Sequence, residues 1–148
     1  DDTNWWDWVY LRNMTWLSPA RTKIFCPCKE RFDSKGYVRF CLVKGDVLPL
    51  QDVTGMVPFK ETQESPELIT AWLNSDYVYD WLVAKGHSRG GVLEFSEAPL
   101  MRIPFLKIDF ESRKEKELHD EITLLFNNET IDTNELNHAF VKLLKLRS

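Results

Sequence analysis

The segment GHSRGG, residues 86–91, holds the side chains of this chain that are best suited to contact an anion. It contains an imidazole, a hydroxyl, a guanidinium and two adjacent glycines, in the order His87, Ser88, Arg89, Gly90 and Gly91. A guanidinium presents a planar fork of N–H donors that matches carboxylate and phosphate geometry. Glycine has no side chain, so the backbone can approach a ligand closely. The segment is therefore predicted to be a binding loop.

An amphipathic helix precedes this loop and must position it. Ser65 is typical of an N-cap and Pro66 of a first helical residue, which predicts a helix from Pro66 to Lys85. Gly86 stands where a left-handed C-cap residue belongs. Alternating residues over Val92–Phe95 predict a strand after the loop. The apolar stripe of the helix comprises Leu68, Ile69, Trp72, Leu73, Val78, Trp81 and Leu82.

The rest of the chain predicts an α+β order, with strands first and helices later. Strands over Thr22–Cys28 and Tyr37–Val43, joined by the turn Asp33–Gly36, indicate a hairpin. Further short strands are expected at Val47–Leu50 and Met56–Phe59, broken by Pro49 and Gly55. Helical segments are expected at Glu97–Met101, Phe110–Asn127 and Thr133–Leu146, the last capped by Asp132 or Thr133. The aromatic-rich segment Asn4–Leu17 fits a short helix or an extended entry segment.

Length and composition indicate one globular domain. The chain has 148 residues, 43% of them hydrophobic, and no apolar run approaches the roughly 20 residues of a membrane span. We therefore expect a soluble protein. The net charge is −4, yet residues 11–60 hold nine Lys or Arg against four acids, and residues 81–107 hold four against two. Screening confines each field to about 8 Å at physiological salt, so one basic face is compatible with an acidic total.

The three cysteines, Cys26, Cys28 and Cys41, favour a reducing compartment, because their number is odd and they form no paired framework. Cys26 and Cys28 lie on one face of a predicted strand, where small buried residues are common. A zinc site would need Cys41 and a histidine as further ligands. We interpret the cysteines as buried structural thiols and expect no metal.

Several segments, in their order along the chain, resemble the TaqI-like C-terminal specificity domains of adenine-N6 DNA methyltransferases from restriction–modification systems. The central ones are AWLNS at 71–75, KGHSRGG at 85–91 and RIPF at 102–105. Upstream, PARTKIFCPCKERF at 19–32 and VTGMVPF at 53–59 resemble the strands of that family. Downstream, LHDEITLLF at 118–126 and ELNHAFVKLLKL at 135–146 resemble its helical tail.

The resemblance implies a fold and a division of labour. The fold would be a small curved mixed or antiparallel sheet flanked by helices, with an entry segment at 1–20, a DNA target recognition domain at 21–109 and a helical tail at 110–148. Methyl transfer in this family needs a base-holding motif with two prolines and a glycine loop for S-adenosylmethionine, and this chain contains neither. Catalysis and cofactor binding are therefore expected in an N-terminal domain of the same cytoplasmic polypeptide, from which this chain, lacking an initiator Met, is expected to be a part.

Double-stranded DNA is the partner that the resemblance implies, and the cations near the loop are its candidate contacts. Arginine binds base edges and phosphates with two N–H groups at once, so Arg89 is the first candidate for a groove contact. The supporting candidates in and beside the loop are His87, Ser88, Lys85, Gly90 and Gly91. The second choices, in the predicted hairpin, are Arg31, Lys29, Arg39 and Arg21.

Two other functions stay open. Half of a type I restriction specificity subunit has related recognition domains, and long coiled-coil heptads in the tail would favour it. A protein–protein adaptor without nucleic-acid contact would use the aromatic N-terminus and the tail helices. A self-contained hydrolase is disfavoured, because Ser88 adjoins His87 without a nucleophile-elbow motif.

Overall fold

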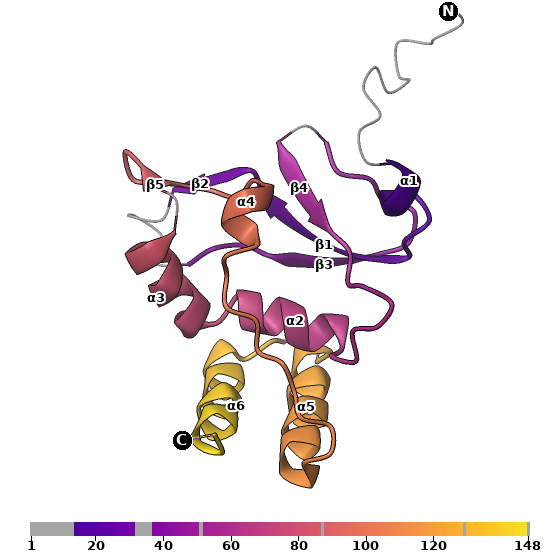
Figure 1. Cartoon of the computed structure of the whole chain (residues 1–148), viewed down its shortest axis with the longest axis vertical. Coiled ribbons are helices and arrows are strands. Elements are labelled where there is room, and N and C mark those ends of the chain that lie inside the picture. The colour runs from indigo at the N-terminus through magenta and orange to yellow at the C-terminus, as the bar shows by residue number, and fades with distance from the viewer. Residues whose placement is uncertain (1–13, 32–36, 51, 87, 129, 148) are drawn as a thin grey trace, which may run out of the picture.

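The computed structural model describes residues 14–31, 37–50, 52–86, 88–128 and 130–147, with the backbone alone for Met14, Trp16, Ser88, Arg89 and Glu97. Within these ranges, two three-stranded antiparallel sheets lie above a layer of helices, and a further helix pair lies below that layer (Figure 1). The predicted α+β class is confirmed, and the helical tail is at the C-terminal end.

The first sheet has β1 (Thr22–Pro27) at its centre, between β3 (Cys41–Lys44) and β4 (Val53–Met56). The predicted antiparallel pairing of the first two long segments is confirmed, since Phe25 is opposite Cys41. The second strand begins at Cys41 and not at Tyr37, and the turn predicted at 33–36 lies outside the described residues. The strand predicted at 47–50 is wrong, because these residues form no strand, and the next strand contains Gly55 instead of starting after it. Gly55 fits there because an added Cβ would lie 3.0 Å from Leu17 Cδ2.

The second sheet, which the sequence did not predict, has β6 (Val92–Glu94) between β2 (Lys29–Arg31) and β5 (Ser88–Arg89). The chain passes from β1 to β2 through Cys28, so the two sheets are continuous there. The N–H of Cys28 donates to the carbonyl of Asp52 at 2.8 Å, and its carbonyl accepts from the N–H of Phe95 at 2.8 Å. Cys28 therefore bonds to a segment of each sheet.

The helix predicted over 66–85 is two helices, α2 (Pro66–Leu73) and α3 (Asp76–Lys85). The start is as predicted, with the Ser65 hydroxyl accepting from the N–H of Leu68 at 3.0 Å. The break has a local cause, because Ser75 Oγ accepts from the N–H of Val78 at 3.4 Å and donates to the carbonyl of Trp72 at 2.7 Å. Ser75 is thus the N-cap of a second helix.

Gly86, which follows α3, is not the predicted left-handed cap, since its φ is −64° and its ψ 159°. Glycine is needed there for a close approach. An added Cβ would lie 2.3 Å from the carbonyl oxygen of Leu82 and 3.0 Å from Leu93 Cδ2. The prediction that the helix ends at this residue is nevertheless confirmed.

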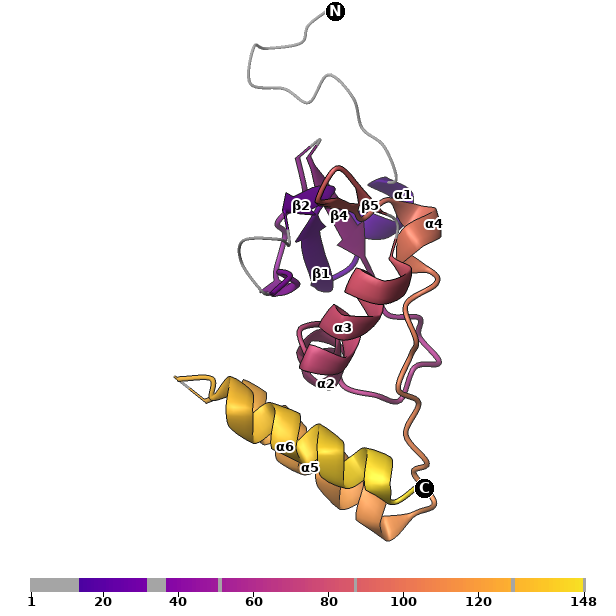
Figure 2. The ribbon, with the colours of Figure 1, turned by 90° about the vertical axis from the view of Figure 1, so that its left-hand side faces the viewer.

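The tail helices, α5 (Arg113–Phe126) and α6 (Thr133–Lys145), pack together beneath α2 in both ribbon views (Figures 1 and 2). Ser112 caps the first, so it begins three residues later than predicted, and Asp132 caps the second as predicted. His119 joins the tail to α2, because its Nε2 accepts from the N–H of Ser65 at 3.0 Å. Two short helices complete the described chain, α1 (Met14–Leu17) and α4 (Glu97–Leu100).

The apolar core lies on both sides of α2, toward the sheets and toward the tail helices. Trp72 packs edge-to-face on Phe140 of α6 with ring centroids 5.3 Å apart, and its indole N–H donates to the carbonyl of Pro104 at 2.7 Å. The largest buried apolar side chains of the cluster include Phe95, Phe140, Ile24, Leu68, Leu93, Ile122 and Leu143. Among the residues that the structure describes, no helix has the length and apolar character to cross a lipid bilayer.

Candidate nucleic-acid interface

The predicted binding loop contains the turn of a short β-hairpin. β5 and β6 pair antiparallel with Arg89 opposite Val92, and Gly90 and Gly91 connect them. The two glycines have φ values of 61° and 77°. Two successive left-handed residues are typical of a type I′ turn, a conformation that glycine adopts readily. The glycines therefore form the tip of the hairpin.

His87 lies outside the described residues, and the side chains of Ser88 and Arg89 are likewise not described. The backbone places Ser88 opposite Leu93, next to the pair formed by Arg89 and Val92. Lys85 is the exposed last residue of α3, one residue before Gly86. The roles predicted for these side chains remain predictions.

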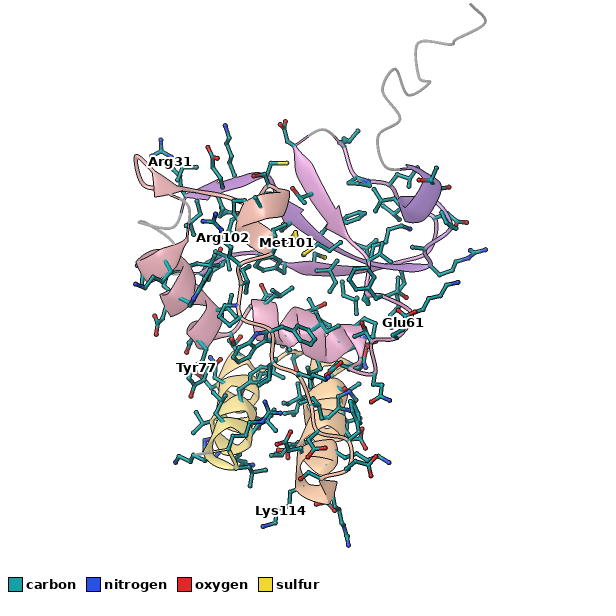
Figure 3. All side chains as sticks on the ribbon, in the orientation of Figure 1. Arg31, Glu61, Tyr77, Met101, Arg102 and Lys114 are labelled. Carbon is teal, nitrogen blue, oxygen red and sulfur yellow. The ribbon has the colours of Figure 1, made fainter. Side chains whose placement is uncertain are left out.

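β2 extends the hairpin into a three-stranded unit, here called the basic ribbon (β2, β6 and β5). Arg31 is opposite Val92, and Lys29 is opposite Glu94. Arg31 and Arg89 therefore occupy one cross-strand row, on either side of Val92. The side chains of Lys29 and Arg31 are exposed, and Arg31 lies beside the hairpin in Figure 3. The fold thus brings two of the predicted hairpin cations next to the predicted loop.

Arg39 reaches the same strand through an ion pair. Its Nε donates to Glu30 Oε2 at 2.8 Å, and its Nη2 lies 2.7 Å from the same oxygen. The Arg39 side chain is 58% exposed, whereas that of Glu30 is 3% exposed. A carboxylate inside the protein therefore holds a guanidinium at its surface. Sequence reasoning selected the arginine and missed its partner.

Arg21, the remaining predicted cation, is not brought to the ribbon. It precedes the first residue of β1, whereas β2 follows the last one. Its Nη1 lies 3.1 Å from Asp46 Oδ1, and both side chains are more than three-quarters exposed, at 78% and 76%. A pair this exposed contributes little to stability.

Comparison with protein families gives no match to this chain. Comparison with curated proteins gives type II methyltransferase M.HindII of Haemophilus influenzae, 44% identical over an alignment of 144 residues that covers 94% of this chain and 28% of the relative. The chain is homologous to the C-terminal part of type II methyltransferases.

Two further relatives are also type II methyltransferases. Type II methyltransferase M.HincII of Haemophilus influenzae is 43% identical over 94% of this chain and 29% of its own length. Type II methyltransferase M.MjaIV of Methanocaldococcus jannaschii is 27% identical over 88% of this chain and 44% of its own. The chain thus spans less than a third of either Haemophilus relative and less than half of the third.

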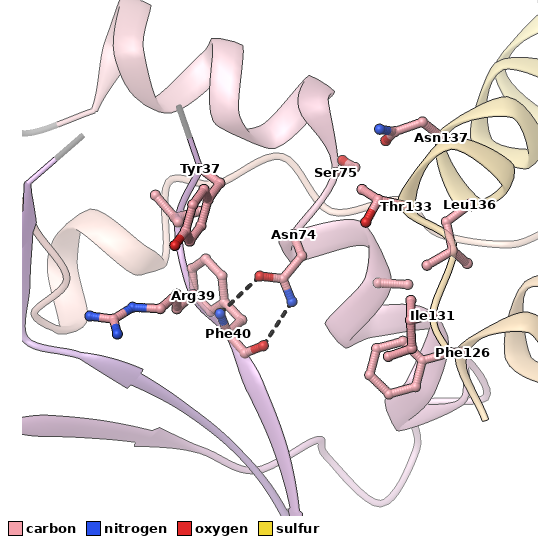
Figure 4. Close-up of a pocket in the computed structure, with 12 residues that line it drawn as sticks. Tyr37, Arg39, Phe40, Asn74, Ser75, Phe126, Ile131, Thr133, Leu136 and Asn137 are labelled. Carbon is pink, nitrogen blue, oxygen red and sulfur yellow. Dashed lines mark hydrogen bonds between the residues drawn. The ribbon is translucent and has the colours of Figure 1, made fainter. Parts of the chain in front are cut away.

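The extended segment 37–40, which contains Arg39, is fixed by a side chain and not by a strand. The Asn74 amide mimics a strand partner, because Oδ1 accepts from the N–H of Phe40 at 2.9 Å and Nδ2 donates to its carbonyl at 2.7 Å (Figure 4). Exposure alternates along the segment, with Tyr37 and Arg39 exposed and Val38 and Phe40 buried. The alternation was visible in the sequence, but the asparagine 34 positions away was not an evident partner.

This segment borders a cavity of about 380 Å³, which it lines together with the end of α2 and the tail (Figure 4). Its far wall comes from the end of α5, the start of α6 and the segment between them. The labelled residues that line it there are Phe126, Ile131, Thr133, Leu136 and Asn137. The lining is mostly apolar, and Asn137 Oδ1 already accepts from the N–H of Asp76 at 3.2 Å.

The thiols agree only in part with the prediction. Cys26 is buried, and this burial, with a smaller contribution from Cys28, raises its pKa to about 12, so the thiol stays neutral. Cys28 is half-buried and its Sγ lies 3.3 Å from Thr54 Oγ1. Cys41 is exposed, which the interpretation as a buried thiol got wrong. Among the described residues, no three His, Cys, Asp or Glu side chains are grouped to hold a metal ion.

Proposed function

We propose that this chain is the region of an adenine-specific DNA methyltransferase that recognises the target site in double-stranded DNA. The observation that carries the proposal is the strand register of the basic ribbon, which gathers Lys29 and Arg31 beside the hairpin of Arg89. The homology to type II methyltransferases supports the same conclusion. It extends over 94% of the chain.

The β5–β6 hairpin of the basic ribbon suits DNA in shape, because the major groove of B-DNA is about 12 Å wide and admits a two-stranded β-ribbon. The third strand, β2, adds the charges of Lys29 and Arg31 beside this hairpin. Arginine at such a position reads guanine through O6 and N7, and lysine or arginine at the edges neutralises phosphates. Arg31 and Arg89, in one row across the ribbon, are the candidates for base contacts. Lys29 and Lys85 are the candidates for phosphate contacts.

Methyl transfer and S-adenosylmethionine binding are assigned to another part of the parent protein, in the cytoplasm. The assignment rests on two findings: the absence of the base-holding motif from this sequence, and the length of the curated relatives, of which this chain spans less than half. The type I alternative is weakened by the tail helices, which have 14 and 13 residues and pack on each other and on α2. They are short for spacer helices.

Binding of a labelled duplex, followed by fluorescence anisotropy at several salt concentrations, tests the proposal. The 148-residue chain should bind with an affinity that falls as salt rises, because phosphate contacts release counterions. Substituting Lys29→Gln and Arg31→Gln together should weaken binding and flatten the salt slope by about two if both residues contact phosphates, and by less for each that reads a base edge. Lys114→Gln with Lys116→Gln is the matched control, because both lysines are exposed on α5 (Figure 3 labels Lys114).

The control should bind as the unsubstituted chain does. Failure of the unsubstituted chain to bind any duplex would refute the proposal for this chain and favour the adaptor alternative. An equal loss in both double variants would show that any removed charge weakens binding, so that the ribbon is not the interface.

A further inference from the structure

Glu30 is a buried carboxylate on the edge strand of the basic ribbon. Its residue is 4% exposed, and its backbone pairs with that of Leu93, which is fully buried. Its neighbours in β2, Lys29 and Arg31, are both exposed, because successive side chains of a strand point to opposite faces. Burying a carboxylate costs free energy unless it is paired and hydrogen-bonded. The central residue of this short edge strand is therefore a carboxylate whose burial destabilises the fold unless it is paired.

Arg39, a partner of this carboxylate, is held so that most of its N–H donors stay outside the pair. Arg39 uses Nε and one N–H of Nη2 on a single oxygen, Glu30 Oε2. An arginine has five N–H donors, so Nη1 and the second N–H of Nη2 remain for another ligand. The Arg39 side chain is more than half exposed. The pair therefore fixes the orientation of the guanidinium and still leaves N–H groups on Nη1 and Nη2 for a second ligand.

The backbone that carries Arg39 is fixed as well. The Asn74 amide bonds to both the N–H and the carbonyl of Phe40, the next residue. The alternation of the segment then places Tyr37 and Arg39 on the outward side. Both ends of the arginine side chain are therefore restrained, at the backbone by Asn74 and at the head group by Glu30. Such restraint lowers the entropic cost of ordering this side chain when it binds a ligand.

We propose that Glu30 is a positioning residue for DNA binding, and that it holds Arg39 ready to contact a phosphate at the edge of the basic ribbon. The inference rests on the proposed function and adds a positioning residue and a second contact segment to it. The two possible roles of Glu30 change DNA affinity in opposite directions. An acid near a phosphate-binding surface repels DNA, so a carboxylate that only stabilised the fold would weaken binding by its charge. A positioning carboxylate must strengthen binding in spite of that charge.

The test is a double-substitution cycle read by duplex affinity, using the 148-residue chain and a labelled duplex. Glu30→Gln keeps the shape of the side chain and removes its charge. It should weaken duplex binding by about tenfold, the scale of one charge-assisted hydrogen bond. In the Arg39→Gln background the same substitution should not weaken binding, because there is no guanidinium to hold and a charge that repels DNA is removed. Glu117→Gln is the matched control, since Glu117 pairs with Arg113 at 2.7 Å on the exposed face of α5.

The outcomes separate this inference from the proposed function. Tighter binding by the Glu30→Gln chain, or an equal loss in both backgrounds, would overturn the positioning role and leave the ribbon as a DNA interface. Absence of duplex binding by the unsubstituted chain would overturn both. Should Glu30→Gln lower the melting temperature too far for binding to be measured, Arg39→Lys decides the question. It keeps the charge and loses the fork, so it should still weaken binding several-fold, and unchanged binding would refute the inference.

Discussion

The two sheets are joined at Cys28 but differ in the environment of their side chains. β1 of the first sheet buries Lys23, Ile24 and Cys26 over six residues. The strands of the basic ribbon have only two or three residues, and β2 buries Glu30 alone. The first sheet therefore supplies more of the packing, whereas the ribbon buries Leu93 and Glu30 and exposes the charged side chains of Lys29 and Arg31. Stability and binding should consequently depend on different substitutions.

The largest effect on stability is expected in the first sheet. Ile24→Ala removes a side chain that is 2% exposed at the centre of β1, so it should lower the free energy of unfolding by about 2–5 kcal/mol. Chemical denaturation measures this loss. Val47→Ala, at a half-exposed position outside the strands, is the control and should change stability by no more than about 0.5 kcal/mol. A small effect at Ile24 would contradict the assignment of the packing to this sheet.

Asn74→Ala tests the junction between the two regions, where α2 ends beside the segment of Arg39. The substitution leaves the N–H and the carbonyl of Phe40 without their partner, which should cost about 1–3 kcal/mol of stability. It should also weaken duplex binding, because Arg39 loses its backbone restraint. Asn127→Ala removes an amide bonded to the carbonyl of Thr123 on an exposed helix end and serves as the control. Equal losses of stability in the two variants would show that the two bonds from Asn74 to Phe40 stabilise the protein no more than an exposed helix-end bond does.

The elements that local chemistry determines were predictable from the sequence. Ser65 and Asp132 cap the helices that they were expected to cap, and Gly90 and Gly91, which were expected in a loop, form the turn of a hairpin. The break between α2 and α3 was not predicted, because apolar spacing continues through it, although the N-cap that causes it, Ser75, is a local signal. The bonds of Asn74 to Phe40 could not be predicted in this way, because the partner lies 34 positions away in the sequence.

The sequence predicted which types of residue form the candidate site, but not where the fold places each of them. Arg21 and Arg31 are both arginines near the same predicted hairpin, yet one precedes β1 and the other lies in the second sheet. Their separation follows from the passage of the chain between sheets at Cys28, which depends on Asp52 and Phe95 as partners. Glu30 was overlooked because a glutamate between two cations is usually a solvated residue.

Arg89→Ala tests the ribbon at its tip and should leave stability unchanged. We expect a loss of duplex affinity on the order of 1–3 kcal/mol, because the residue adjoins the turn and shares a row with Arg31. A base contact would change which sequences are bound, whereas a phosphate contact would weaken all of them alike and reduce the salt slope by about one. Competition with random and specific duplexes at several salt concentrations distinguishes the two. If affinity, sequence preference and salt slope are all unchanged, Arg39 and Arg31 become the leading contacts.

The smallest effect is expected from a charged pair that serves structure instead of binding. Glu115 at the start of α5 accepts from Arg147 Nε at 3.0 Å and from the N–H of Asp109 at 2.9 Å, and the Arg147 bond lowers the pKa of this carboxyl. A lowered folded pKa gives stability above the unfolded value of about 4.3, and this stability is lost as the pH falls through the folded pKa.

Glu115→Gln should therefore lower stability at pH 7 by about 1 kcal/mol or less, because Arg147 is partly exposed to screening solvent. The difference between the two proteins should shrink as the pH falls below 4 and vanish once Glu115 is protonated in the unsubstituted chain. Denaturation curves of both proteins at a series of pH values measure it, since other carboxylates contribute equally to each. A difference that persists at low pH would mean that Glu115 acts through shape and hydrogen bonding and not through charge. Duplex binding at pH 7 should be the same in both proteins, because this pair ties the end of the chain to α5 and lies outside the ribbon.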